Sequence, residues 1–473
     1  MKLDCARISH LVVLTHCRCL LVLACASAAC STLGSSVITG PNSLRSVKIP
    51  FQTVMLDNGL QVILNEDHRV PVVAVDVIYG VGWSDDPPGK PSLAHYFEHL
   101  MFQGSAHVAA NAHFEYLESA GAARIGGRTE PDITEYFETV PANQLELALW
   151  LESDRMGFMQ DSLDSQKIER VRAVVDNEYR QRRDNATIGR AMEFMFSAVF
   201  PQGHPYHGAR KRPTDEESIT LNDLQQLGRT YYIPNNASLA LSGDFEPATA
   251  VALIDHYFGS LPPGPKPIRP PTRSISPVRP TLLHIAAAVE REQLLLAWPT
   301  PAVGQPDDAE LDVAAFTLNT AFLRRVLIEE TPVAVSARAH HFSGLQGGMF
   351  FIAIDLRPGW TAEAALQTVD KQLRLLRDFR VRQSWSLFAS QSVLKEVLEG
   401  AQTTAGRAEK LNRYGVLMHN PGYLADEVAR FDQIVPADVL DAIWRYLPDD
   451  NRVVALVHAD RSAPVGGRLV EKP

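Results

Sequence analysis

The chain has 473 residues, of which 45% are hydrophobic and 21% charged, so it is long enough for two or three domains and too apolar for a disordered protein. Its formal net charge of -10, with both signs abundant, gives no support to nucleic-acid binding. All five cysteines fall within residues 1–30, so the remainder has neither a disulfide framework nor a thiolate metal site, and any metal there must use histidines and carboxylates.

Residues 1–30 resemble a secretory signal, with basic residues ahead of the apolar stretch "CLLVLACASAAC". Small residues at 26–28 suit ordinary cleavage, whereas Cys25 or Cys30 suits lipid modification. An uncleaved anchor fits less well because the apolar stretch is short, and a mitochondrial presequence would carry more arginine. We therefore expect a periplasmic or secreted protein, or a lipid-anchored one, which touches a membrane only in the last case.

The following region alternates pairs of strands with groups of helices. Apolar and β-branched residues predict strands, and periodic apolar residues predict helices. We expect strands at 60–67, 71–82, 123–130 and 134–140, and helices at 93–104, 111–120, 143–159 and 164–184. Adjacent strand pairs favour an α+β fold with a mainly antiparallel sheet packed against several helices.

The chain divides into two similar halves. The proline-rich stretch 263–280 predicts a linker between domains at 45–262 and 281–462. Both domains close with an amphipathic helix, aromatic residues, a proline turn and a strand, and the turn prolines Pro234 and Pro448 are 448 − 234 = 214 residues apart. A duplicated domain is the simplest explanation.

The helical stretch "LAHYFEHLMFQG" contains the principal chemical motif. His95 and His99 are four residues apart and share one helix face, with Glu98 beside them. Two imidazoles can chelate one zinc ion while the carboxylate accepts a proton from water. The alternative is a pair of core or surface histidines that are four residues apart by chance.

A third ligand is expected from the helix "KIERVRAVVDNEYRQR". Its apolar stripe of Ile168, Val171 and Val175 continues to Glu178, which places a carboxylate where a core residue is expected. A metal would remove the cost of burying that charge. The pattern alone also allows an ordinary surface carboxylate at the end of a helix.

Over residues 50–460 the chain resembles the pitrilysin family of inverzincin zinc metallopeptidases, which includes the mitochondrial processing peptidases and related bacterial peptidases. The resemblance rests on H-x-x-E-H at 95–99 followed by "VVDNE" at 174–178, and on the stretches "TEYFETVP" and "LWLESDRM". It implies one Zn²⁺ per chain, held by His95, His99 and Glu178, with Glu98 as the general base acting on water.

The resemblance also implies that extended peptides bind along a strand edge, here 123–130. Gly126 and Gly127 stand where relatives usually have Asn-Ala, and with Arg128 they are our candidates for substrate binding. The glycines either allow the backbone closer to substrate or mark a bulge that weakens the strand.

The second half lacks an arginine and a tyrosine that reach the substrate in complete relatives. Ile328 and Val335 occupy those positions, so we expect a zinc-free homologous subunit to supply the missing pair. A homodimer is the alternative, with these contacts dispensable or replaced locally. A shift of 214 residues places the zinc motif at "DAELDVAAFTLN", which has no histidine, and we interpret His340, His341, His204 and His207 as structural.

The expected function is therefore a zinc-dependent endopeptidase that hydrolyses extended or unfolded peptides as the catalytic subunit of a heterodimer. The alternatives are a non-catalytic assembly subunit and a peptide-binding module that keeps its metal for structure.

Overall fold

The computed structural model describes residues 47–181, 189, 191–208, 219–268, 278–378, 383–463 and 467–471, all within one compact unit that begins at Leu44. The expected signal at 1–30 and the middle of the expected linker, 269–277, lie outside the described residues. Residues 263–268 and 278–280 have no regular secondary structure, which agrees with their proline content.

The first half is built on a six-stranded sheet in the order β1-β2-β6-β3-β5-β4. β2 and β6 pair in parallel and the other neighbours are antiparallel. The strands are β1 (Gln52–Met55), β2 (Gln61–Glu66), β3 (Val72–Tyr79), β4 (Ala123–Thr129), β5 (Thr134–Pro141) and β6 (Ala237–Gly243). β4 is thus an edge strand.

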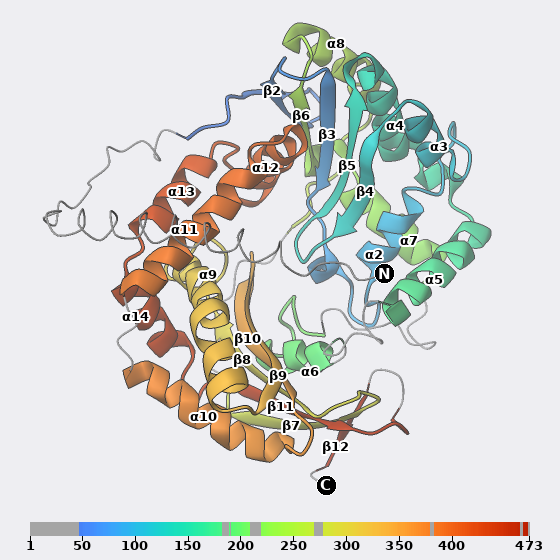
Figure 1. The fold of residues 1–473 in the computed structure, drawn as a ribbon. Helices are drawn as coiled ribbons and strands as arrows, with labels where there is room; N and C mark the ends of the chain where they lie inside the picture. The colour runs from blue at the N-terminus through green and yellow to red at the C-terminus, as the bar shows by residue number, and fades with distance from the viewer. Residues whose placement is uncertain are drawn as a thin grey trace, which may run out of the picture. The chain divides into compact units, whose positions relative to one another are not determined.

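Most helices of the first half pack on this sheet or on one another, whereas α6 (Ala191–Val199) packs on two strands of the second half's sheet. The other helices are α2 (Leu93–Leu100), α3 (Ala112–Ser119), α4 (Leu145–Phe158), α5 (Ser165–Tyr179), α7 (Leu221–Tyr231) and α8 (Pro247–Phe258). In Figure 1, α3 and α4 lie beside β4 and β5. The apolar sides of α4, α5 and α7 bury Leu149, Val171 and Leu224 in one core with β3 and β5.

The second half repeats this design in the order β12-β7-β11-β8-β10-β9. β7 and β11 form its one parallel pair among the described strands, as β2 and β6 do in the first half. The strands are β7 (Thr281–Ala287), β8 (Gln293–Thr300), β9 (Ala334–Gly344), β10 (Gly347–Leu356), β11 (Val453–Ala459) and β12 (Arg468–Val470). The expected α+β class with two homologous, mainly antiparallel domains is confirmed.

The helices of the second half pack on its own sheet or on one another, and one of them packs on the sheet of the first half. They are α9 (Asp308–Thr317), followed by a π-helical stretch (Leu318–Glu330), then α10 (Ala362–Asp378), α11 (Gln383–Gly400), α12 (Thr404–Leu417), α13 (Leu424–Gln433) and α14 (Pro436–Tyr446). Helix α12 packs against β3 and β6 of the first half, where Asn412 donates to the carbonyl oxygen of Asp76 (2.9 Å).

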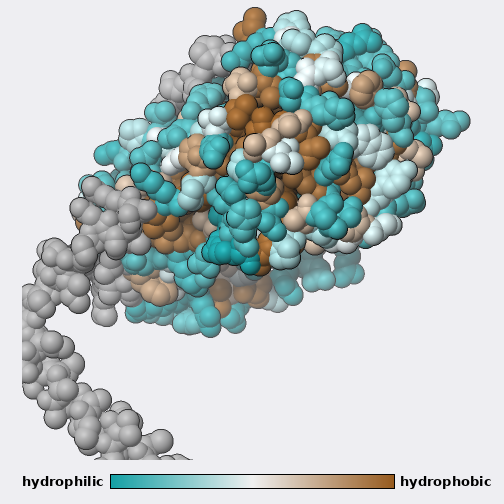
Figure 2. All heavy atoms as spheres, turned by 90° about the horizontal axis from the view of Figure 1, so that it is seen from above, coloured by the Kyte–Doolittle hydropathy of each residue, from teal (hydrophilic) through white to brown (hydrophobic). Residues whose placement is uncertain are grey.

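The described surface in Figure 2 is largely hydrophilic, with hydrophobic residues gathered toward its middle. Within the described part of the chain, none of the helices combines the length and the hydropathy that a membrane span requires.

Candidate metal centre

Helix α2 presents the histidines of the H-x-x-E-H motif on one side. Leu93, Phe97 and Leu100 are buried in the core of the first half, and this packing fixes the orientation of the helix. Asp86 accepts a hydrogen bond from the backbone amide of Ala94 (2.8 Å), which satisfies one of the free N–H groups of the first turn. The helix ends at Leu100, so the predicted extension to residue 104 is wrong.

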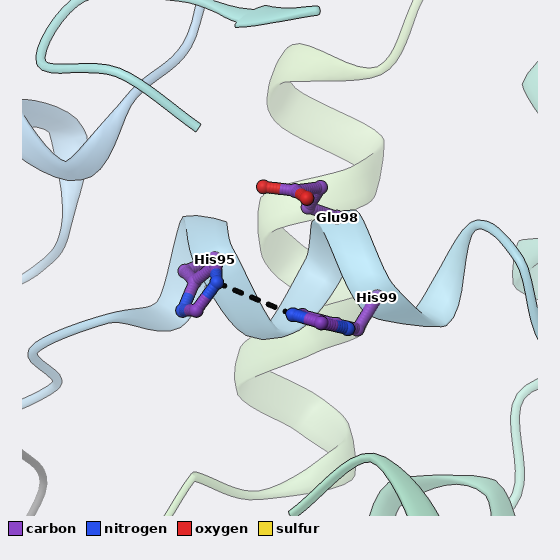
Figure 3. Close-up of side chains that lie close together, drawn as sticks. All are labelled: His95, Glu98 and His99. Atoms are coloured by element: carbon purple, nitrogen blue, oxygen red, sulfur yellow. Dashed lines mark hydrogen bonds between the residues drawn. The ribbon is translucent and has the colours of Figure 1, made fainter. Parts of the chain in front are cut away.

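His95 and His99 lie one helical turn apart with their rings turned toward each other (Figure 3). Their Nε2 atoms are 3.2 Å apart. Glu178 brings Oε2 to 3.1 Å from His99 Nε2 and 3.7 Å from His95 Nε2. Three possible ligand atoms from two helices therefore meet at one point.

These separations fit a zinc ion. Tetrahedral zinc with nitrogen and oxygen ligands at about 2.0–2.1 Å places neighbouring ligand atoms about 3.3 Å apart. The distances of 3.1, 3.2 and 3.7 Å form one face of such a tetrahedron and leave the fourth corner to a water molecule or a substrate. The donor set of two imidazoles and one carboxylate is also one that zinc accepts in catalytic sites.

Glu98 lies beside this group but is held separately. Its side chain is buried, and an oxygen of the carboxylate lies within 4.8 Å of the nearest ring nitrogens of His95 and His99. Thr129 Oγ1 on β4 donates a hydrogen bond to Glu98 Oε2 (2.6 Å). Thr129 thereby orients the carboxylate next to the three ligand atoms.

Helix α5 carries Glu178 to the site. Asp164 caps its N-terminus by accepting from the backbone amide of Lys167 (2.7 Å). Its stripe of Ile168, Val171 and Val175 is buried as predicted, but the buried residue that continues the stripe is Tyr179. The side chain of Glu178 is 22% exposed, so this carboxylate is partly buried beside the stripe.

Tyr179 also ties the two helices together. Its hydroxyl and that of Ser92, the residue before α2, form a hydrogen bond, and its ring packs edge-on against His95 at 6.2 Å. The end of α5 is thus fixed to the start of α2. This contact explains how a glutamate 79 residues from His99 reaches the histidine pair.

The site opens into a cavity of about 620 Å³ lined by both halves. Ser92, His95, Glu98, Glu178 and residues 127–133 line it from the first half, and Val303, residues 340–345, Arg413 and Leu417 from the second. A volume of this size holds a short peptide segment rather than a single small ion.

The three candidate substrate residues lie together on the edge strand β4, and Gly127 and Arg128 line the cavity. The register of β4 against β5 shifts between Ala123 and Gly126, whereas Gly126 and Gly127 themselves pair in regular register with Phe137 and Tyr136. A Cβ atom on Gly127 would lie 3.1 Å from the ring of Tyr136 and 3.2 Å from that of Phe102. Arg128 donates to Glu135 (2.5 Å) and, across the halves, to Glu409 (2.6 Å).

Sequence reasoning missed several polar groups of this cavity, among them Thr129, Arg413 and Asp132. Arg413 on α12 donates to both oxygens of Glu130 (2.9 and 2.7 Å); burial opposes its charge, but Glu130 and Glu135 raise the pKa of Arg413 above its ordinary value. Asp132 is buried and accepts from the hydroxyl of Tyr206 (2.7 Å) and the amide of Leu345 (2.9 Å). Arg413 and Asp132 both join segments far apart in sequence, so no local pattern marks them.

Ile328 and Val335 do not line this cavity. Both line a separate open groove that includes Ser336 and Ala337 of β9. Within the described residues, the two positions that the family resemblance assigns to an arginine and a tyrosine therefore contribute no polar group to the cavity.

The remaining histidines have different roles. His340 is exposed and His341 is buried, as expected for neighbours on a strand, and His341 contacts Asp312 (2.8 Å) and Thr300 (3.1 Å). His204 accepts from the amide of Tyr206 (3.0 Å) and donates to the carbonyl of Gln346 (3.1 Å), which agrees with the predicted structural role. In the second half, α9 follows β8 as α2 follows β3, and its sequence has no histidine.

Comparison with known families covers most of both halves. Residues 61–203 match the profile described as insulinase (peptidase family M16), and residues 218–384 match that described as peptidase M16 inactive domain. The zinc protease PqqE of Helicobacter pylori is 27% identical over 362 residues, which are 75% of this chain and 79% of that protein. Coenzyme PQQ synthesis protein F of Pseudomonas aeruginosa is 27% identical over 225 residues, 46% of this chain and 28% of that protein.

Solved structures agree on the fold. A protease from Helicobacter pylori superposes with a TM-score of 0.80 at 24% identity and covers 87% of this chain and 100% of its own. The periplasmic protease PqqL from Escherichia coli superposes with a TM-score of 0.68 at 17% identity, over 88% of this chain and 48% of its own. With matching profiles in both halves and the same fold in these relatives, the chain belongs to the M16, or pitrilysin, family of peptidases.

Proposed function

We propose that this chain is a zinc-dependent endopeptidase that hydrolyses extended or unfolded peptides. The observation that carries the proposal is the convergence of His95 Nε2, His99 Nε2 and Glu178 Oε2 within 3.1–3.7 Å of one another, at a cavity bordered by an edge strand. The names of relatives such as the zinc protease PqqE support the same reaction class.

In this proposal His95, His99 and Glu178 hold one Zn²⁺, which would polarise the scissile carbonyl and acidify water. Glu98 takes the proton of the attacking water and gives it to the leaving amine. Thr129 holds one carboxylate oxygen of Glu98 by a hydrogen bond and so fixes the orientation of the base beside the histidine pair. The burial of Glu98 limits competing contacts with bulk water.

The edge strand β4 is the proposed peptide-binding strand. Gly126, Gly127 and Arg128 lie on it, and an edge strand offers backbone N–H and C=O groups to an extended peptide. Such pairing recognises the backbone and makes few demands on sequence, which suits an enzyme for unfolded peptides. Arg128 contributes through its ion pairs by fixing the strand beside Glu135.

Replacing Glu98 by glutamine tests the chemistry apart from the metal. Glu98→Gln keeps the size of the side chain but cannot take a proton, so kcat on an unstructured fluorogenic peptide should fall at least about 100-fold. Its zinc content, measured by mass spectrometry, should equal that of the wild type. Glu115→Gln, an exposed change on α3, is the matched control and should leave both unchanged.

The same measurements separate the enzyme from its alternatives. A His95→Ala/His99→Ala double variant should lose one zinc ion per chain together with all activity. If the wild type holds no zinc that this variant lacks, a non-catalytic assembly subunit is the better assignment. If Glu98→Gln cleaves peptide as fast as the wild type, Glu98 is not the base.

We also propose that full activity requires a zinc-free homologous subunit. Support comes from Ile328 and Val335, which stand at the positions of the family's arginine and tyrosine and line a groove other than the zinc cavity. Comparing peptide cleavage by this chain alone and after mixing with such a homologue tests the idea. We expect at least a tenfold gain, whereas equal rates would favour a chain that works alone or as a homodimer.

Export is a further proposal, based on the composition of residues 1–30. A periplasmic or secreted product should begin near residue 29 in N-terminal sequencing, and a lipid-anchored one should begin at a modified cysteine and fractionate with membranes. Recovery of the intact N-terminus from the cytoplasm would contradict export.

A further inference from the structure

The second half contains a separate group of metal-binding side chains. His284 on β7, His458 on β11 and Glu363 in the first turn of α10 bring one ligand atom each within 4.8 Å of one another. None belongs to the H-x-x-E-H motif or lines the cavity of the first site. The group is built entirely within one domain.

The sheet register places both histidines on the same face. β7 and β11 are parallel neighbours in which Ala286 pairs with His458 and His284 with Leu456. Paired residues point to the same face, and so do residues two apart on one strand, so His284 and His458 are diagonal neighbours. Helix α10 packs against β11 and supplies Glu363.

The ring nitrogens of the two histidines face each other. His284 Nδ1 lies 3.1 Å from His458 Nε2, and the ring planes are within 10° of parallel. Glu363 Oε1 lies 4.0 Å from His458 Nε2. The nitrogen separation is close to the about 3.3 Å between neighbouring ligands of a tetrahedral zinc ion.

Glu292 fixes the tautomer of His458. Its Oε2 lies 3.0 Å from His458 Nδ1, and its Oε1 accepts from the backbone amide of Ala459 (3.0 Å). A carboxylate can only accept here, so Nδ1 of the neutral ring carries the hydrogen and Nε2 keeps its lone pair. A carboxylate behind a histidine is the usual support of a metal-bound imidazole.

A third cluster of possible metal ligands differs from the His284 group because it contains an arginine. His113, Glu138 and Glu152 also lie within reach of one ion, but Arg155 donates to Glu152 (2.9 Å) inside that cluster. A guanidinium already balances the carboxylates there, and a divalent cation beside it would be repelled. The His284 group contains two carboxylates, and within the described residues no arginine or lysine pairs with its members.

We propose that His284, His458 and Glu363 bind a second divalent transition-metal ion, with Zn²⁺ as the best match to two imidazoles and a carboxylate. The total would then be two ions per chain rather than the one expected from sequence. By joining β7, β11 and α10, the second ion would stabilise the domain that lacks the H-x-x-E-H motif.

Zinc stoichiometry of the purified full chain tests this inference. After loading with excess ZnCl₂ and desalting, we expect about two ions in the wild type, one in His95→Ala/His99→Ala, one in His458→Gln and none in the triple variant. His256→Gln, an exposed histidine on α8, is the control and should keep two. A His95→Ala/His99→Ala protein without bound zinc would overturn the proposal.

Affinity in the His95→Ala/His99→Ala background gives an independent readout. Glu363→Gln changes a side chain that is 44% exposed, so it should fold normally and weaken Zn²⁺ binding at least tenfold in competition with a chromogenic chelator. Loading with Co²⁺ should give the visible absorption of a four-coordinate ion, and His458→Gln should abolish it. Unchanged affinity in Glu363→Gln, or unchanged absorption in His458→Gln, would remove those residues as ligands.

Discussion

At the scale of single residues, the site depends on how Glu98 is held. Its carboxylate is buried next to the histidine pair, and a hydroxyl on another element, Thr129 on β4, donates to it at 2.6 Å. A hydrogen bond to a charged group contributes about 1.5–3 kcal/mol. Thr129 is therefore a positioning residue that acts through Glu98.

Removing that hydroxyl should slow the reaction without removing metal. Thr129→Val keeps the shape of the side chain, and we expect kcat to fall about 10-fold or more, with KM and zinc content close to wild type. Thr129→Ser should restore most of the rate because it restores the donor. Steady-state kinetics on an unstructured peptide measure both, and a Thr129→Val enzyme with wild-type kcat would show that Glu98 is positioned by other contacts.

Sequence predicts the histidine pair because its geometry is local. His95 and His99 are one turn apart on any α-helix, so their spacing alone places them together. The helix pattern alone leaves Glu178 as either a metal ligand or an ordinary surface carboxylate. Its contact with His99 spans 79 residues and depends on the packing of α2 against α5. The sequence pattern does not predict Thr129 and Arg413 as site residues, because only the folded chain brings them to the cavity.

At the scale of elements, β4 is the segment on which substrate binding depends. It is an edge strand with a bulge at its start, and Arg124 in the bulge has a positive φ of 52°. Gly127 lies under the rings of Tyr136 and Phe102. Close packing against these two rings therefore fixes the position of β4 in the stretch that lines the cavity.

A side chain on Gly127 should disturb this packing. Gly127→Val would press on rings only 3.1 and 3.2 Å from the new Cβ, and overpacking of this kind costs about 1–3 kcal/mol. We expect a lower urea midpoint and a higher KM, since β4 must shift. Ala123→Val, at the exposed start of the same strand, should change neither, and equal effects of the two changes would argue against a packing role for Gly127.

Element types were easier to predict than their pairing. Alternating and periodic residues predict β2 to β5 and α2 to α5, although α2 ends earlier than its pattern suggests; π-helical residues 180–181 follow α5, and residues 182–184 of its expected range lie outside the described residues. The parallel pairs β2–β6 and β7–β11 have no local signal, because each joins strands separated by a whole domain. Their equivalence nevertheless supports the duplication inferred from Pro234 and Pro448.

At the scale of the whole molecule, α12 connects the two halves by buried and partly buried polar contacts. Asn412 donates to the Asp76 carbonyl (2.9 Å), Arg413 pairs with Glu130 (2.7 Å), and Arg407 donates to Asn65 (2.9 Å). Arg407 also forms an ion pair with Asp67, and both side chains are at most 11% exposed. Removing one partner of such a pair leaves the other charge buried and uncompensated.

The contacts of Asp67 with Arg69 and Arg407 predict a pH dependence of the free energy of unfolding. The hydrogen bond from Arg69 is the main cause that lowers the pKa of Asp67 from 3.8 to about 2; burial opposes it, and the charge of Arg407 adds to the lowering. Because the folded state holds the carboxylate ionised more strongly than the unfolded state does, Asp67 stabilises the fold above pH 3.8. That contribution is lost as the pH falls toward 2.

Asp67→Asn should therefore destabilise the protein by about 1–3 kcal/mol at pH 7, as expected for losing hydrogen bonds to a charged group. The difference from wild type in urea midpoint should shrink as the pH is lowered through 4 toward 3, because the Asp67 carboxylate of the unfolded wild type takes up a proton in this range while the folded protein still holds it ionised. Asp57→Asn, on the exposed turn before β2, is the control and should differ little from wild type throughout. A gap that stays constant between pH 7 and pH 3 would mean that Asp67 stabilises the junction through its shape and not through its charge.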